Sequence, residues 1–276
     1  MRTWLKEVDG IDWGDAALMN CRWRGPRLCD ILNAAGVTAD AQTGHVAFAC
    51  RSTETQNDSW YGASVELERA VAKDRDIIVT LERNSEPLTP NHGAPARIIV
   101  PGVAGARSVE WVDRITVQQT ESSNFYQNRD YKVLPEKVEN ADEAEEYWQQ
   151  IPALQDMPVN SVITSPRSSD SITADDEGMI TIRGYAVPGG CHGPIAKVDV
   201  SSDEQKTWTE ATIHDCPGKW SWALWSIKLR ADRGTKMRLF SRATDQSGDQ
   251  QTAEPKWNLR GVAYNGYGES RNVTIL

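Results

Sequence analysis

Several features that would assign the chain to a special class are missing from its sequence. No run of apolar residues approaches the roughly 20 that span a bilayer, and Met1–Asp9 has no apolar core of a signal peptide. The five cysteines are odd in number and show no CxxC spacing. We therefore expect free thiols in a reducing compartment, and a soluble intracellular protein with no membrane partner and no targeting signal.

Positive charge is also scarce. The chain has 30 Lys and Arg against 39 Asp and Glu, a net charge of −9. Proteins that bind nucleic acid present basic surfaces, so we expect no nucleic-acid partner. An anionic substrate would need a local cationic site, against the overall field. With 276 residues, the chain is long enough for two domains that need no disulfides.

The first half of the chain mixes short helices and short strands. The apolar residues of 28–36 recur at helical spacing, and Gly36 ends the pattern. Short apolar runs predict strands, and one charged segment with apolar residues on one side predicts a helical turn or two. The predicted strands are 45–49, 76–81, 97–103 and 111–117, and the predicted helical turns are 66–73.

From Val159 onward the texture changes to short alternating strands separated by Gly, Pro, Asp and Ser. Such spacing is typical of an immunoglobulin-like β-sandwich. Large aromatics alternate in Lys219–Trp225, which predicts a core strand of the sandwich. The segment Glu136–Gln150 is acidic and lacks a strong apolar face, so we interpret it as a solvated surface linker. The predicted domains are residues 1–150 and 151–276.

Three stretches go beyond generic globular texture. They are Asn91–Arg97 with the following Val100–Val109, then Arg129–Lys132, and Trp257–Val262. In order and separation, they resemble the sulfite oxidase family, which also includes assimilatory nitrate reductases; Gly10–Trp13 and Arg22–Leu28 extend the resemblance. It implies an α+β, mostly β fold: an incomplete molybdopterin-binding oxidoreductase domain, then an immunoglobulin-like dimerisation domain that forms a homodimer.

The resemblance implies four residues that hold a molybdenum–molybdopterin cofactor. His92 and Arg97 match the segment that contacts the pterin and its phosphate, and an arginine offers such a phosphate a fixed bidentate fork. The turn that carries Arg107 and Ser108 would add backbone amides and a hydroxyl around the same group. Without the resemblance, we would interpret His92 as an ordinary loop histidine.

The resemblance also assigns an active site. Tyr131 matches a tyrosine beside the metal and the substrate, where a phenol donates a hydrogen bond or relays a proton. Arg260 matches an arginine of the sulfite pocket, and Trp13 matches an aromatic residue that lines this pocket. Without the family, Tyr131 would be a loop-edge tyrosine and Trp13 a core residue.

The chain departs from the family pattern in several places, of which two concern the cofactor most. The Cys-Ala-Gly-Asn-Arg-Arg-like motif that supplies the metal's cysteine is not present, and we assign none of the five cysteines to molybdenum. Glu110 replaces the usual lysine near the expected phosphate. No b-type haem motif occurs, so we expect no haem in this chain and an external electron acceptor.

The resulting expectation is oxidation of sulfite to sulfate in sulfur metabolism, with little or no activity from this chain alone. One alternative is a non-catalytic fragment or dimerisation module. Another is a nitrate reductase, although nitrate reductases depart from arginine at the position of Arg260. The family relatives imply a mitochondrial or peroxisomal location.

Overall fold

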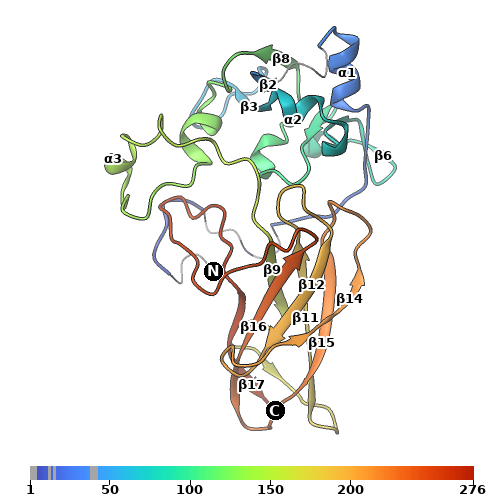
Figure 1. The fold of residues 1–276 in the computed structure, drawn as a ribbon, viewed down its shortest axis with the longest axis vertical. Coiled ribbons are helices and arrows are strands. Elements are labelled where there is room, and N and C mark those ends of the chain that lie inside the picture. The colour runs from blue at the N-terminus through green and yellow to red at the C-terminus, as the bar shows by residue number, and fades with distance from the viewer. Residues whose placement is uncertain (1–4, 12–13, 15–16, 38–42) are drawn as a thin grey trace.

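The computed structural model describes residues 5–11, 14, 17–37 and 43–276 as two stacked domains (Figure 1). Small sheets and short helices form the first domain, and long strands form the second. Within the described residues, no helix has both the length and the apolar character needed to cross a membrane. The predicted fold class, α+β but mostly β with an immunoglobulin-like sandwich second, is confirmed.

The first domain surrounds one apolar core that includes Leu28, Phe48 and Ile98, all fully buried. Its three small sheets have the strand orders β1-β5-β6, β3-β2-β8 and β4-β7, and every pairing is antiparallel. The elements are β1 (Trp23–Arg24), α1 (Leu28–Ala34), β2 (His45–Cys50), β3 (Tyr61–Glu66), α2 (Leu67–Val71), β4 (Ile78–Thr80), β5 (Glu82–Arg83), β6 (Glu86–Pro87), β7 (Arg97–Ile99), β8 (Arg114–Gln118) and α3 (Ala141–Ala144).

Local sequence explains most of these elements. Leu28 and Leu32 lie one turn apart on α1 and are both buried, and Gly36 follows with a φ of 83° that suits glycine. The predicted strand 97–103 ends earlier, at Ile99, because a turn begins at Pro101. Gly102 in this turn has a φ of 73°.

The second domain is a sandwich of two sheets. One has the strand order β10-β17-β16-β12-β13 and the other β14-β15-β11-β9. All pairs are antiparallel except β10 with β17. The strands are β9 (Asn160–Ser165), β10 (Ser171–Ile172), β11 (Met179–Val187), β12 (Ile195–Ser201), β13 (Thr209–Glu210), β14 (Thr212–Asp215), β15 (Ala223–Arg230), β16 (Lys236–Asp245) and β17 (Gly268–Ile275).

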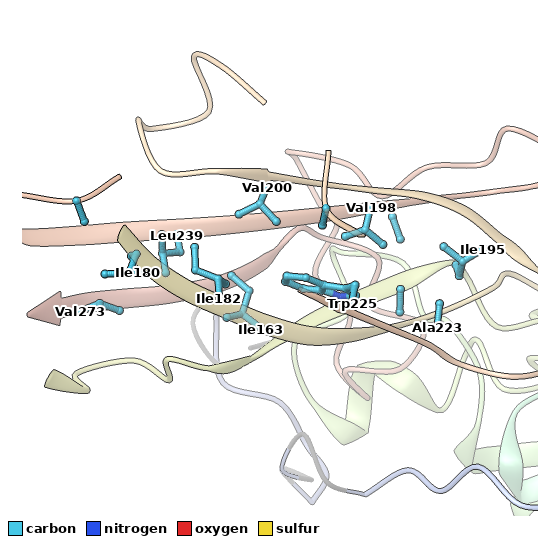
Figure 2. Packing of buried hydrophobic residues seen from close by; sticks show 14 of the residues in the cluster. Ile163, Ile180, Ile182, Ile195, Val198, Val200, Ala223, Trp225, Leu239 and Val273 are labelled. Atoms are coloured by element: carbon cyan, nitrogen blue, oxygen red, sulfur yellow. The ribbon is translucent and has the colours of Figure 1, made fainter. Parts of the chain in front are cut away.

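Trp225 lies at the centre of the sandwich core, between the two sheets (Figure 2). Alternate residues of β11, such as Ile180 and Ile182, point into the same core, as period-2 alternation requires. The indole lies against Gly184, where an added Cβ would be 2.3 Å from a ring carbon. A glycine at this position therefore lets the large ring fit between the sheets.

The prediction of one aromatic core strand over 219–225 is wrong for its first half. The strand β15 begins only at Ala223, and residues before it form a turn toward the first domain. The Trp220 indole N–H donates to the Asp76 carboxylate at 2.9 Å, and Trp222 lies against Tyr185 at 5.8 Å between ring centroids. Of these three tryptophans, only Trp225 is buried in the sandwich core. Trp220 and Trp222 contact residues that the alternation of apolar and polar residues does not predict.

The predicted solvated linker 136–150 is likewise partly wrong. Val138, Ala144 and Trp148 are buried in a small core with Leu259, and Trp257 packs against it. Ala144, Tyr147, Trp148 and Ile151 recur at helical spacing, but acidic and amide residues lie between them and Leu259 comes from the far end of the chain. The connection between β16 and β17 therefore leaves the sandwich and packs on the first domain.

Candidate active site at the domain junction

A five-residue π-helical turn, Tyr126–Asp130, precedes Tyr131 and sets its position. Such turns are rare and occur often at functional sites. The turn is anchored from the first domain, where Asn124 donates to the Asp58 carboxylate at 3.0 Å and to a main-chain carbonyl at 2.8 Å. The Tyr131 carbonyl accepts the Leu154 N–H at 2.8 Å. The backbone around Tyr131 is therefore fixed from both sides.

Arg107 holds this turn in place by hydrogen bonds to its main-chain carbonyls. Its side chain is completely buried and makes four hydrogen bonds to three main-chain carbonyls: Leu154 twice at 3.0 and 3.1 Å, Tyr126 at 2.9 Å and Tyr131 at 3.3 Å. Burial lowers the pKa of Arg107, although Tyr61 and other acidic neighbours oppose this shift. The described contacts of Arg107 thus support the backbone, and its predicted contact with a cofactor phosphate stays a prediction.

Arg260 arrives from the connection between β16 and β17 and meets Asp130. The guanidinium binds the Asp130 carboxylate through Nη2 and through Nε, the latter at 3.1 Å, and it also binds the main-chain carbonyl and the carboxylate of Asp9. The Arg260 and Asp130 side chains are 22% and 18% exposed, so the pair is half-buried and reachable from solvent. Two predicted residues, Tyr131 and Arg260, are therefore brought together through Asp130.

The electrostatics of Tyr131 reflect these neighbours. Burial raises the pKa of the Tyr131 phenol, and Asp130 raises it further, whereas Arg107 and Arg260 lower it. The raised pKa keeps the phenol protonated at neutral pH, so that it can donate a hydrogen bond. Tyr131 is therefore a hydrogen-bond donor near the half-buried Arg260 cation.

A cavity in the first domain is lined by other predicted residues. It has a volume of about 240 Å³ and is lined by Arg97 and Ser108 together with Tyr61, Gly105 and Glu110. Arg97 pairs with Glu110 at 2.6 Å, and its buried Nε has no hydrogen-bond partner in the described structure. The Ser108 oxygen accepts the Val100 N–H at 3.1 Å, which leaves its hydroxyl hydrogen for another acceptor. The cavity can therefore hold an anionic group.

Tyr61 lies between this cavity and the cluster around Tyr131. Its ring centroid is 5.1 Å from that of Tyr126, and its hydroxyl donates to the Ala106 carbonyl at 2.8 Å. Burial and the neighbouring Tyr131 raise its pKa. Neither Tyr61 nor Asp130 is among the residues predicted from sequence. Asp130 lies directly before Tyr131 in the segment Arg129–Lys132, and this position is the one feature of the sequence that could have marked it as a site residue.

The remaining predicted residues lie apart from this arrangement or outside the described residues. His92 ends a short 3-10 turn, and its Nδ1 hydrogen-bonds the Thr89 hydroxyl at 2.7 Å. It does not line the cavity with Arg97. Trp13 lies outside the described residues.

One group within the described structure has the composition of a cation site, and it lies in the second domain. His192, Asp245 and Asp249 place their ligand atoms within 4.8 Å of one another. The buried Asp245 carboxylate already accepts main-chain N–H groups of Gly189, Ser247 and Asp249. We interpret this group as a loop-holding network.

Comparison with known proteins identifies the two domains. Residues 1–126 match the family model of the oxidoreductase molybdopterin binding domain, and residues 151–272 match the Mo-co oxidoreductase dimerisation domain. These two domains in this order define the class of molybdopterin oxidoreductases with a dimerisation domain.

The particular family follows from the relatives. Mitochondrial sulfite oxidase of Homo sapiens is 37% identical over 96% of this chain and 48% of its own length. Sulfite oxidase of Arabidopsis thaliana is 35% identical over 94% of this chain and 68% of its own. An NADH nitrate reductase of Volvox carteri is 34% identical over 95% of this chain and 32% of its own. The chain belongs to the sulfite oxidase family.

A solved structure agrees with this assignment. The crystal structure of the sulfane dehydrogenase SoxCD from Paracoccus pantotrophus matches with a TM-score of 0.72 and 26% identity, over 91% of this chain and 62% of that one. The chain spans about half the length of the mitochondrial sulfite oxidases that it matches.

Proposed function

We propose that the protein to which this chain belongs oxidises sulfite to sulfate at a molybdenum–pyranopterin centre. The observation that carries the proposal is the meeting of Arg260 and Tyr131 through Asp130, although the two residues lie far apart in sequence. Their meeting puts an anion-binding cation beside a protonated phenol, which is what turnover of an oxyanion requires.

The residues present fit the phosphate end of a pterin cofactor. Arg97, whose buried Nε has no hydrogen-bond partner in the part of the chain that the structure describes, lines a cavity of about 240 Å³ together with Ser108. A buried donor without an acceptor costs about 1–3 kcal/mol, and a phosphate oxygen would remove this cost. When bound, the cofactor supplies the two-electron exchange that protein side chains cannot perform.

Each site residue then has a role that its surroundings support. Arg260 binds the substrate anion, in exchange for part of its contact with Asp130 and Asp9. The Tyr131 phenol donates a hydrogen bond at its hydroxyl and holds or passes a proton there. Arg97 and Ser108 hold the phosphate, and we keep His92 as a pterin contact. Arg107 acts on the same site through the backbone of Tyr131.

The same proposal includes a homodimer through the second domain, an external electron acceptor and a mitochondrial or peroxisomal location. Support for the dimer comes from the match to a dimerisation domain, and support for the location from the mitochondrial relatives. The nitrate reductase alternative retains the support of the Volvox carteri relative. Arg260 weighs against it, since nitrate reductases depart from arginine at this position.

Paired assays of the complete protein test the proposal. We expect sulfite-dependent reduction of an artificial acceptor and no nitrate-dependent oxidation of a reduced dye. The reverse pattern would favour the nitrate reductase alternative. Assays of this 276-residue chain alone should give little or no turnover, and robust turnover by it would contradict that expectation.

A further inference from the structure

The loop between β2 and β3 contacts both the cavity in the first domain and the turn that precedes Tyr131. On one side, Thr55 of this loop lines the cavity. On the other side, the Asp58 carboxylate binds Asn124 and Phe125, the two residues directly before the π-helical turn. The Asn124 side-chain amide and the Phe125 N–H donate to the same oxygen, Oδ2, each at 3.0 Å. One carboxylate therefore joins the loop to the turn.

Asp58 is held in place from within its own loop. The Thr55 N–H and hydroxyl donate to the Asp58 carbonyl at 2.9 and 2.8 Å, and the Asp58 N–H donates to the Thr55 hydroxyl oxygen at 3.1 Å. Such side-chain to main-chain bonds close a compact turn. The other carboxylate oxygen, Oδ1, accepts the Ser59 N–H at 2.8 Å. Since the main chain and both carboxylate oxygens of Asp58 are engaged, the orientation of its side chain is fixed.

The residues that Asp58 binds begin the turn that leads to Tyr131. The Asn124 carbonyl accepts two N–H groups of this turn, both at 3.0 Å, and the Asn124 side-chain oxygen accepts the Tyr126 N–H at 3.2 Å. Because Asp58 binds the side-chain nitrogen of Asn124, it also sets the direction of the amide oxygen that binds Tyr126. The turn ends directly before Tyr131. A shift at the beginning of the turn is therefore passed on to the phenol.

The charge of Asp58 strengthens its hold on the turn. A hydrogen bond to an ionised acceptor is about twice as strong as one between neutral groups. Arg107 binds carbonyls of Tyr126 and Tyr131, whereas Asp58 binds N–H groups at the beginning of the same segment. The two charged side chains therefore hold the turn through groups of opposite polarity, and neither replaces the other.

We propose that Asp58 is a positioning residue for Tyr131, an inference that rests on the function proposed above. It acts through the turn and keeps the phenol in its half-buried place, where the proton is retained. Arg260 comes from the connection between β16 and β17, and none of the hydrogen bonds of Asp58 in the described residues reaches this connection. Loss of Asp58 should therefore disturb proton handling by Tyr131 more than anion binding by Arg260.

The first test is the titration of Tyr131 in this 276-residue chain. Absorbance at 295 nm follows the phenolate, and the same variant with Tyr131→Phe supplies each background. Burial is the largest cause of the raised pKa of Tyr131, so that a released turn, which admits water, lowers this pKa. Asp58→Ala should therefore titrate Tyr131 at lower pH than the parent chain. Asp58→Asn loses the charge but keeps a side-chain oxygen, so its titration should lie between the two.

Asp113 offers a matched control. Its carboxylate accepts the main-chain N–H groups of Arg51 and Ser52, at 2.7 and 3.2 Å, at the start of the same loop. Asp113→Ala removes the same charge and two accepted bonds, but it leaves the bonds between Asp58 and the turn. It should leave the titration of Tyr131 unchanged.

Three results of the titration would overturn the proposal. An unchanged titration in Asp58→Ala would show that the turn does not need this carboxylate. Equal shifts in Asp58→Ala and Asp113→Ala would mean that loosening any part of the loop suffices. Equal shifts in Asp58→Ala and Asp58→Asn would assign the effect to charge alone.

The second test is turnover of sulfite by the complete, cofactor-loaded protein. Positioned proton transfer contributes about 10²- to 10⁴-fold to a rate, so a partly displaced phenol in Asp58→Ala should lower kcat by about tenfold. KM should stay nearly unchanged, and Asp113→Ala should keep both parent values. A raised KM with an unchanged kcat would overturn the proposal, because Asp58 would then act on substrate binding.

Circular dichroism checks that each variant is folded. If Asp58→Ala fails to fold, Asp58→Asn is compared with Asp113→Asn, and only the Asp58 variant should titrate Tyr131 at lower pH. The titration uses no sulfite. If the complete protein does not oxidise sulfite, the proposed function fails, while the titration still decides whether Asp58 positions Tyr131.

Discussion

Arg107 and Arg97 lie ten positions apart in the first domain, and the structure uses them in opposite ways. Arg107 is completely buried and donates only to main-chain carbonyls. Arg97 lines a cavity, pairs with a carboxylate and keeps a buried donor that has no partner among the described residues. The difference teaches that burial alone does not mark a ligand site. An unsatisfied donor beside a cavity does, because the free energy of an unpaired buried group is recovered only when a ligand binds.

The largest effect that we expect is the loss of stability when Arg107 is replaced. Arg107→Met removes four hydrogen bonds and takes this donor from the carbonyls of Leu154 and Tyr126, whereas the Tyr131 carbonyl still accepts the Leu154 N–H. We expect a loss of about 2–6 kcal/mol in the free energy of unfolding, from about 1–3 kcal/mol for each of the two carbonyls that lose their donor. Urea denaturation followed by tryptophan fluorescence measures it.

The matched substitution Arg97→Met should cost much less, because it leaves only Glu110, whose side chain has access to solvent. We expect about 1 kcal/mol or less for this partly exposed pair. Equal losses for the two variants would break the comparison, since both arginines would then be structural.

A smaller effect is expected on the titration of Tyr131. Its pKa is raised by burial and by Asp130, and lowered by Arg107 and Arg260. Asp130→Asn removes a negative charge and frees the Arg260 cation, and both changes lower the pKa of the phenol. Phenolate absorbance at 295 nm should rise at lower pH in this variant than in the parent chain, with a Tyr131→Phe background subtracted from each. A titration that moves to higher pH would show that Asp130 does not act on Tyr131.

The raised pKa of Tyr131 also has a consequence for stability. Because the folded state binds the phenolic proton more tightly than the unfolded state, this contribution is complete below the ordinary tyrosine pKa of about 10. It is lost as the pH rises through the folded-state value. Stability should therefore fall in alkali, and Asp130→Asn should show a smaller fall.

A small effect on stability is also expected at Tyr61, which lies between the cavity and the cluster around Tyr131. Tyr61→Phe deletes one hydrogen bond to the Ala106 carbonyl but keeps the ring contact with Tyr126. The cost should be about 1 kcal/mol, the usual contribution of one such bond. Thermal unfolding at pH 7 measures this loss of stability. An unchanged stability would mean that packing alone holds the Tyr61 ring in place.

Sequence patterns predicted the parts of the fold that depend on local periodicity. The helix at Leu28–Ala34, the strand at His45–Cys50 and the alternation of β11 follow from residues close in sequence. The contact of Trp220 with Asp76 was missed, because it joins residues 144 positions apart. The burial of Trp148 was missed for another reason: Ala144, Tyr147 and Ile151 lie at helical spacing from it, but the acidic and amide residues between them weaken the apolar face.

In the candidate site, too, some residues were predicted from the sequence and others were not. Tyr131 and Arg260 were found because the motifs around them resemble a family, not because any local pattern showed that they meet. Asp130, which joins them, has no signature of its own, since an aspartate before a tyrosine is ordinary in loops. The structural role of Arg107 depends on carbonyls of two segments, the turn that holds Tyr126 and Tyr131 and the segment around Leu154, which no pattern of side chains encodes.

The central claim is that Arg260 is the cation that binds the substrate at the domain junction. The most direct measurement is the Michaelis constant for sulfite of the complete protein, compared between the parent and Arg260→Met. The loss of a charge-assisted contact, worth about 1.5–3 kcal/mol, should raise this constant by roughly 10- to 150-fold. An unchanged constant in a folded, cofactor-loaded variant would contradict the account and leave Arg260 as a partner of Asp130 alone.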